Sequence, residues 1–160
     1  MDRVPCEGPP LMADNMLGTL AKWLRVAGVD CDNADGMEDD DLVEVARSGR
    51  TVLTRDRLLA QRCSDSGLLI GSDDLDEQLL QVLRTMPDLL DGEPMSRCLV
   101  CNVRVEPATS GDVEGTVPQG VLERHNEFRL CPRCGRAYWV GTHVEDMLDR
   151  LASLRERAQG

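Results

Sequence analysis

Four of the seven cysteines form two closely spaced pairs, and these pairs predict a metal site. "CLVC" supplies Cys98 and Cys101, and "CPRC" supplies Cys131 and Cys134. Each C-x-x-C turn can aim two thiolates at one point, and two such turns complete the tetrahedron that Zn²⁺ accepts. Because protein would fill all four positions, we expect a closed, structural zinc site. The alternatives are buried thiols or a redox-active dithiol.

The segment around these cysteines, residues 95–141, has few large apolar side chains, so we expect it to fold only with its metal bound. Gly135 follows the second pair, where the backbone often needs a positive φ. Tyr138 and Trp139 come next, in a chain with few other aromatic residues. We expect both to pack against the metal site or a domain junction, and stacking on an RNA base is the alternative.

Aspartates form the second group of residues that could do chemistry. Asp14, Asp56 and the pair Asp73 and Asp74 follow short apolar runs, and residues 39–41 open a helix-like segment with three further aspartates. Functional groups gather at the carboxyl ends of strands in open α/β sheets. Crowded carboxylates bind hard cations such as Mg²⁺ or Mn²⁺, which can activate water against a phosphodiester.

A structural reading of the same aspartates is also open. The first 94 residues contain 20 acids, so some acids follow strands by chance. Asp14 could cap the helix after it, and residues 39–41 could be the solvated first turn of a helix, where acids are favoured by the helix dipole.

The elements that must position these residues alternate along the chain. Apolar spacing predicts strands over 9–14, 29–34, 51–54 and 67–72, and helices over 16–28, 39–49, 57–63, 73–86 and from 142 onward. This alternation indicates βαβ units and a mainly parallel sheet. We expect Ser72 to cap the 73–86 helix, and Thr142 to open the last helix in a capping box with Glu145.

These patterns divide the chain into an extension (1–10), an α/β domain (11–90), the cysteine segment (95–141) and a final helix (142–160). The net charge is −11, but residues 95–141 carry five acids and six arginines, so they alone would not repel a polyanion. No apolar run is long enough to span a bilayer, and the N-terminus lacks a signal-peptide core. We expect a cytoplasmic protein with no membrane partner.

Four stretches, "MADNMLGTLAKWLRVAG", "DDDLVEVARSGRTVLTRDRLL", "SRCLVCN" and "CPRCGRAYWVGTH", together resemble a known family over about residues 10–150. It is the mut-seven C-terminal RNase domain, a PIN-like ribonuclease family, in its prokaryotic form with a zinc ribbon. The resemblance implies an α/β, PIN-like fold with a mainly parallel sheet flanked by helices, followed by a small zinc ribbon and a C-terminal helix. It also implies a metal-dependent endoribonuclease that acts on RNA.

The resemblance assigns roles to particular acids. Asp14 matches the family's acid after the first strand, and Thr54-Arg55-Asp56 matches its "T-x-D". Asp39 lies seven residues before Ala46 and fits the "D…A" helix, with Asp41 as runner-up, and Asp73 or Asp74 would supply a further acid. The implied catalytic residues are Asp14, Asp39, Asp41, Asp56 and Asp73, of which Asp14, Asp39 and Asp56 would bind Mg²⁺ or Mn²⁺.

The chain departs from the general PIN pattern because it has no acidic motif between Asp14 and residues 38–41. This departure leaves a second function open. The protein would then be a non-catalytic module on a degenerate PIN-like fold, whose structural zinc ribbon docks to RNA, a ribosome or another protein.

Overall fold

A four-stranded parallel sheet forms the centre of the protein. The computed structural model describes residues 10–160, so the expected N-terminal extension lies outside the described residues except for Pro10. The strands are β1 (Leu11–Ala13), β2 (Cys31–Asn33), β3 (Thr51–Thr54) and β4 (Gly67–Leu69), in the order β2-β1-β3-β4. Leu11 pairs with Cys31 on one side and Thr51 on the other, so β1 is a central strand.

Helices cover both faces of this sheet because its strands carry apolar side chains in both directions. On one face, Leu11, Ala13 and Leu53 pack against α1 (Gly18–Val26) and α4 (Leu75–Thr85). On the other face, Met12 and Val52 pack against α2 (Asp39–Arg47) and α3 (Arg57–Arg62). Successive residues of β1 and β3 therefore alternate between two cores, as a strand period of two requires.

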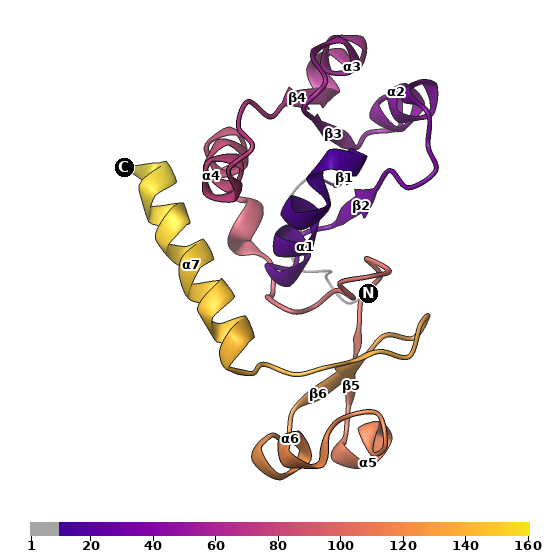
Figure 1. Cartoon of the computed structure of the whole chain (residues 1–160), viewed down its shortest axis with the longest axis vertical. Helices are drawn as coiled ribbons and strands as arrows, with labels where there is room; N and C mark the ends of the chain where they lie inside the picture. The colour runs from indigo at the N-terminus through magenta and orange to yellow at the C-terminus, as the bar shows by residue number, and fades with distance from the viewer. Residues whose placement is uncertain (1–9) are drawn as a thin grey trace, which may run out of the picture.

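The last helix, α7 (Thr142–Gln159), returns to the parallel sheet's core. Figure 1 shows it running beside α4, and its Leu151 and Leu154 are buried in the cluster formed with α1 and α4. The Arg150 guanidinium lies 5.2 Å from the centre of the Trp23 ring, a cation–π contact across α7 and α1. The chain thus enters the cysteine segment and comes back before it ends.

Residues 95–141, called the ribbon below, form a separate small sheet. Its strands are β5 (Glu106–Ala108), β6 (Phe128–Leu130) and β7 (Ala137–Tyr138), all antiparallel in the order β5-β6-β7. Two short helices, α5 (Ser110–Val113) and α6 (Gln119–Arg124), join β5 to β6. Val113, Val117 and Phe128 give the ribbon a small apolar cluster of its own.

The predicted fold class is confirmed: a mixed α/β protein with a parallel sheet flanked by helices, a cysteine cluster consistent with a zinc ribbon, and a C-terminal helix. The described residues also contain three short 3₁₀ turns, at Asn15–Leu17 (η1), Ser64–Ser66 (η2) and Leu89–Asp91 (η3). Across residues 10–160, none of the helices has the length and apolar character that crossing a membrane would require.

Two helix caps differ from the sequence prediction. α4 begins at Leu75, and its cap is Asp74, whose side chain accepts a hydrogen bond from the Glu77 amide at 3.0 Å. The predicted cap Ser72 instead accepts a hydrogen bond from the Asp74 amide. The capping box predicted at Thr142 is also wrong, because α7 starts one residue earlier than that box requires and Gly141 occupies the cap position.

Candidate functional site

The four paired cysteines converge on one point. Among residues 10–160 they are the only His, Cys, Asp or Glu side chains that gather as three or more with ligand atoms within 4.8 Å of one another. Cys98 Sγ and Cys134 Sγ are 3.7 Å apart. This is the separation that tetrahedral geometry gives to two thiolates about 2.3 Å from a zinc ion. The cluster could therefore hold a metal such as zinc.

The two C-x-x-C turns, called the first and second knuckles, have the same backbone geometry. The Cys101 amide donates to Cys98 Sγ at 3.3 Å, and the Cys134 amide donates to Cys131 Sγ at 3.4 Å. Each turn closes with a positive φ, 64° at Asn102 and 78° at Gly135, so the φ predicted for Gly135 is confirmed. Amides directed at sulfur stabilise thiolates, which are the form of cysteine that binds metal.

Electrostatics favour the thiolate form at two of the four cysteines. The backbone amide of Arg136, with its guanidinium, lowers the pKa of Cys134 to about 6. Burial alone would raise the pKa of Cys98, but hydrogen bonds from the Tyr138 hydroxyl and from backbone amides lower it. Desolvation and the neighbouring thiols raise the pKa of Cys101 to about 12. A bound dication would favour the Cys101 thiolate, since its positive charge compensates the negative charge of the neighbouring thiolates.

The first knuckle docks on the start of β2. Asn102 Oδ1 accepts a hydrogen bond from the Cys31 amide at 3.1 Å, and Asn102 Nδ2 donates to Asp30 Oδ1 at 2.7 Å. Arg25, only 2% exposed at the end of α1, donates from Nε to the Cys31 carbonyl and from Nη1 to the Leu99 carbonyl, at 2.7 and 2.8 Å. These bonds tie the ribbon to one end of the parallel sheet.

Asp30 extends this connection to the centre of the sheet. Its carboxylate accepts two hydrogen bonds from Arg50, whose Nη1 also donates to the Leu11 carbonyl. Burial raises the pKa of Asp30, but the hydrogen bonds from Arg50 and Asn102 outweigh burial and hold that pKa below its ordinary 3.8. The ribbon, β2 and β1 therefore share one polar network.

The opposite end of the sheet carries the aspartates predicted from sequence, and we call it the acidic edge (Asp14, Asp39, Asp41, Asp56 and Asp73). Asp14 follows β1 and Asp56 follows β3, which are neighbouring strands. The buried Thr54 hydroxyl donates to Asp14 Oδ2 at 2.8 Å and accepts from the Asp56 amide at 3.0 Å. Thr54 thus connects the two aspartates.

This position is the topological switch point of the sheet. The chain passes from β1 to β2 on one side and then crosses to β3 on the other side. Open parallel sheets bind ligands at the carboxyl ends of the two strands where the order reverses. Here those strands are β1 and β3, so Asp14 and Asp56 lie where the topology favours a ligand.

The remaining predicted acids lie at the same end of the sheet but are held separately. Asp39 is the first residue of α2, and Asp41 Oδ2 accepts a hydrogen bond from the Glu38 amide in a capping box. Between them, Asp40 pairs with Arg62 of α3. Asp73 is exposed beside the α4 cap. Within the described residues, no three carboxylates of the acidic edge have oxygen atoms within 4.8 Å of one another.

A model of the family described as the Mut7-C RNAse domain matches residues 9–151 of this chain. This protein belongs to the Mut7-C RNAse domain family. The match spans the parallel sheet, the ribbon and the first half of α7, as the sequence resemblance implied. Neither the curated proteins nor the solved structures contained a match to the chain. Membership of the Mut7-C RNAse family indicates a ribonuclease-like domain.

Within this Mut7-C protein, Asp14 and Asp56 each also serve as a structural cap. Asp14 caps η1, the 3₁₀ turn that follows it, which is the capping role that the sequence left open. Asp56 Oδ1 accepts hydrogen bonds from the Leu58 and Leu59 amides at 2.9 and 3.2 Å and caps α3. Asp56 Oδ2 has no hydrogen-bond partner within residues 10–160 and is open to a ligand.

The residues that join the ribbon of this Mut7-C protein to its sheet were not identified from sequence. Arg25 reads as an ordinary polar residue at a helix end, and Asp30 as a loop acid. Asn102 offered one signal, because asparagine is among the few residues that tolerate positive φ and it occupies the place that Gly135 has in the second knuckle. The partners of that asparagine lie 71 and 72 residues away, beyond any local pattern.

Proposed function

We propose that this protein is a cytoplasmic endoribonuclease of the PIN-like type, which hydrolyses RNA phosphodiesters with Mg²⁺ or Mn²⁺ at the acidic edge. The observation that carries the proposal is the placement of Asp14 and Asp56, joined by the Thr54 hydroxyl, at the switch point of a sheet in an RNase-family protein. Asp39 supplies a third carboxylate from α2, and Asp41 and Asp73 complete the set.

The carboxylates have distinct tasks in this proposal. Asp56 binds the cation through Oδ2, since its Oδ1 is occupied by the amides of α3. The Thr54 hydroxyl holds the Asp14 carboxylate in place by donating a hydrogen bond to Asp14 Oδ2. When bound, the cation would lower the pKa of a coordinated water and offset charge on the phosphate. Arg55 lies between Thr54 and Asp56, and its buried Nε has no partner within the described residues, so an RNA phosphate could supply one.

The cysteine cluster has a structural role in the same proposal. Zn²⁺ bound by Cys98, Cys101, Cys131 and Cys134 leaves no position for a substrate, because the protein fills the tetrahedron. It holds the two knuckles, and with them the ribbon, against the start of β2. The ribbon can then contact RNA, a ribosome or a partner protein.

Two observations favour a second function. The carboxylates of the acidic edge do not form a group of three within 4.8 Å in the described residues, and the chain carries a net charge of −11. Both features suit a non-catalytic RNA- or protein-binding module. In this interpretation, the carboxylates are too dispersed to form a cation site, and the negative charge repels polyanions from most of the surface.

Cleavage of labelled RNA in Mn²⁺ separates the two functions. Asp56→Asn should abolish cleavage and keep the melting temperature, because asparagine remains a good helix cap. Asp65→Asn is the matched control, since Asp65 is an exposed aspartate in η2, at the other end of β4. Cleavage lost only in Asp56→Asn supports the nuclease. Equal cleavage by the wild type and both variants, or cleavage of none of many RNAs by any of them, supports the binding module.

A further inference from the structure

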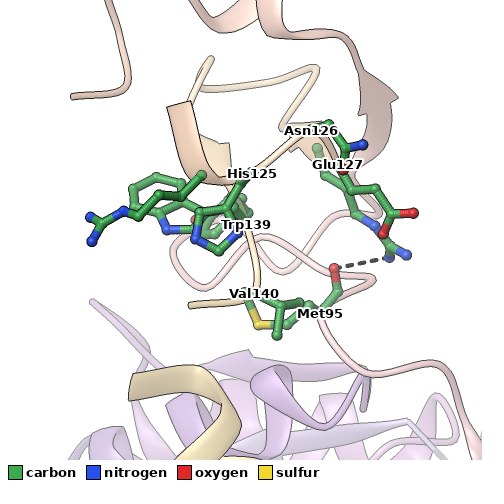
Figure 2. Close-up of a pocket in the computed structure, with 9 residues that line it drawn as sticks. Met95, His125, Asn126, Glu127, Trp139 and Val140 are labelled. Carbon is green, nitrogen blue, oxygen red and sulfur yellow. Dashed lines mark hydrogen bonds between the residues drawn. The ribbon is translucent and has the colours of Figure 1, made fainter. Parts of the chain in front are cut away.

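The ribbon carries a hollow of about 170 Å³ that the proposed catalytic site does not use. It lies between the loop after α6 and the segment after β7. Figure 2 shows His125 and Trp139 on one side of it, Asn126 and Glu127 on the other, and Met95 and Val140 at its base.

Several polar groups around this hollow have no partner within the protein. In the described residues, the side chains of His125, Asn126 and Glu127 form no hydrogen bond or ion pair. Arg124 uses only Nε, which donates to the Gly120 carbonyl at 3.0 Å, so both Nη groups stay available. The neighbouring Arg129 is different, because it already binds the Met95 carbonyl and Glu93.

This combination of groups matches one chemical class of ligand. A half-buried indole offers a face on which any nucleobase can stack, and a nearby guanidinium suits a phosphate. Amide and carboxylate groups opposite the ring can bond the edge of an unpaired base. The ribbon is also the least acidic part of the chain, with six arginines and five acids. A polyanion would therefore approach here more readily than elsewhere.

We propose that this hollow binds one nucleotide of single-stranded RNA. The base stacks on Trp139, the phosphate contacts Arg124, and Asn126 and Glu127 contact the edge of the base. This inference rests on the proposed function for its choice of RNA, although binding in the hollow needs neither the acidic edge nor its cation.

The hollow and the acidic edge lie at different ends of the molecule. The ribbon docks beside Cys31, the first residue of β2, whereas the aspartates follow the last residues of β1 and β3. Figure 1 shows α6 and β6 at the end opposite to α2 and α3. The bound nucleotide is therefore several positions away from the bond to be cut. Long RNAs can reach both sites at once, and very short RNAs cannot.

Tryptophan fluorescence tests the proposal directly, because the chain contains only Trp23 and Trp139. The experiment uses the zinc-loaded full chain with Asp56→Asn and without Mg²⁺ or Mn²⁺, so that binding is measured without cleavage. With Trp23→Phe added, Trp139 is the sole reporter, and a single-stranded oligoribonucleotide should quench it. With Trp139→Phe added instead, Trp23 should report no quenching, and the Kd should rise several-fold because stacking is weakened.

Arginine variants provide a second readout that leaves the ribbon's core intact. Arg124→Gln should weaken RNA binding several-fold and lower the slope of log K against log salt by about 1, as expected for one lost phosphate contact. Arg133→Gln is the matched control, because Arg133 is an exposed ribbon arginine outside the hollow. It should change binding little.

Three outcomes would overturn the proposal. The first is RNA binding with no change in Trp139 fluorescence, as a hollow reserved for a protein partner would give. The second is equal weakening by Arg124→Gln and Arg133→Gln. The third is quenching by a free mononucleotide at the concentration at which RNA acts. Failure of the nuclease proposal looks different, because quenching would persist in a protein that cleaves no RNA.

Discussion

The side chain of Asn102 accepts a hydrogen bond from the backbone amide of Cys31 at 3.1 Å, and this bond joins the first knuckle to the first residue of β2. Asn102 has the same left-handed backbone as Gly135 in the second knuckle. Glycine would serve that backbone better, but it has no side chain to reach the sheet. The residue at this position is therefore explained by docking, and we expect the stabilities of the ribbon and the sheet to be coupled.

Substitution of Asn102 should measure that coupling. Asn102→Gly keeps the positive φ but leaves the Cys31 amide and the Asp30 carboxylate without one partner each. We expect a loss of about 1 to 3 kcal/mol in the free energy of unfolding, the usual cost of an unsatisfied buried polar group. Urea unfolding followed by Trp23 fluorescence would measure it in a Trp139→Phe background.

The reciprocal change at the second knuckle is its control. Gly135→Asn places the same residue at the same backbone conformation, where a Cβ meets nothing within 4 Å. We expect it to cost about 1 kcal/mol, because asparagine adopts a positive φ less readily than glycine. If Asn102→Gly is neutral or more stable than the wild type, the side chain of Asn102 contributes nothing through docking, because glycine relieves the backbone at that position.

Removal of the metal should affect the sheet as well as the ribbon. The ribbon has a small apolar cluster of its own, so we expect chelation to unfold residues 95–141. Arg25 would then lose the Leu99 carbonyl, and β2 would lose Asn102, so the melting temperature of the remaining sheet should fall by several degrees.

Hydrogen exchange measured by mass spectrometry would follow both events, with metal content determined on the same sample. Amides of the ribbon should exchange first on chelation, and protection at Cys31 should fall with them. A chain that contains no zinc and still protects residues 95–141 would contradict this prediction and the metal-dependent folding on which it rests.

Local patterns were sufficient for the parallel sheet and its helices. Thr51–Thr54 is a β-branched run that stops at a polar pair, and β3 has the predicted bounds. The four cysteines were identified because their spacing alone determines the chemistry. By contrast, docking of the ribbon depends on Arg25 and Leu99, which are 74 residues apart, and no period or motif links them.

The acidic edge was predictable only in part. The positions of Asp14 and Asp56 follow from strand ends, and Thr54-x-Asp56 marks the turn that joins them. How closely the other acids approach depends on loops whose geometry sequence does not specify. Asp40 is turned to Arg62, for example, by the packing of α2 against α3. The cap of α4 was also ambiguous from sequence, since Ser72 and Asp74 are both good caps and the helix begins after Asp74.

The Asp30 network predicts a specific dependence on pH. The pKa of Asp30 is lower in the folded protein than its ordinary 3.8, so the unfolded chain binds a proton first as the pH falls. Asp30 therefore contributes stability that is fully present above pH 3.8 and is lost below it. Asp30→Asn should cost about 1 to 2 kcal/mol at neutral pH, and that cost should shrink toward about pH 3.

The free energy of unfolding must be compared between variants at each pH, because acid also releases metal from the thiolates of every variant. Asp32→Asn is the control, since the Asp32 carboxylate accepts only the adjacent Asn33 amide among the hydrogen bonds of the described residues. Its effect on unfolding should not vary with pH in this way. A cost of Asp30→Asn that is the same at pH 3 and pH 7 would show that charge does not contribute to the network.

Thr54 provides the sharpest test of the acidic edge, because its hydroxyl touches both aspartates and is fully buried. Thr54→Val keeps the shape and removes the hydroxyl. Asp14 would lose a donor and the Asp56 amide an acceptor, so both carboxylates would be less well positioned. If the two bind a catalytic cation, Mn²⁺ affinity and cleavage should each fall roughly 10- to 100-fold, as when a residue supporting a metal ligand is lost.

Thr54→Ser separates this positioning role from general destabilisation. It keeps the hydroxyl and removes a buried methyl, at a cost of about 1 kcal/mol in the free energy of unfolding. Thr54→Val should have a similar cost, because it leaves a polar group unpaired. The two variants would then be matched in stability, and only Thr54→Val should lose Mn²⁺ affinity, measured by titration at a fixed RNA concentration. If both cleave RNA like the wild type, Thr54 has no positioning role at the acidic edge.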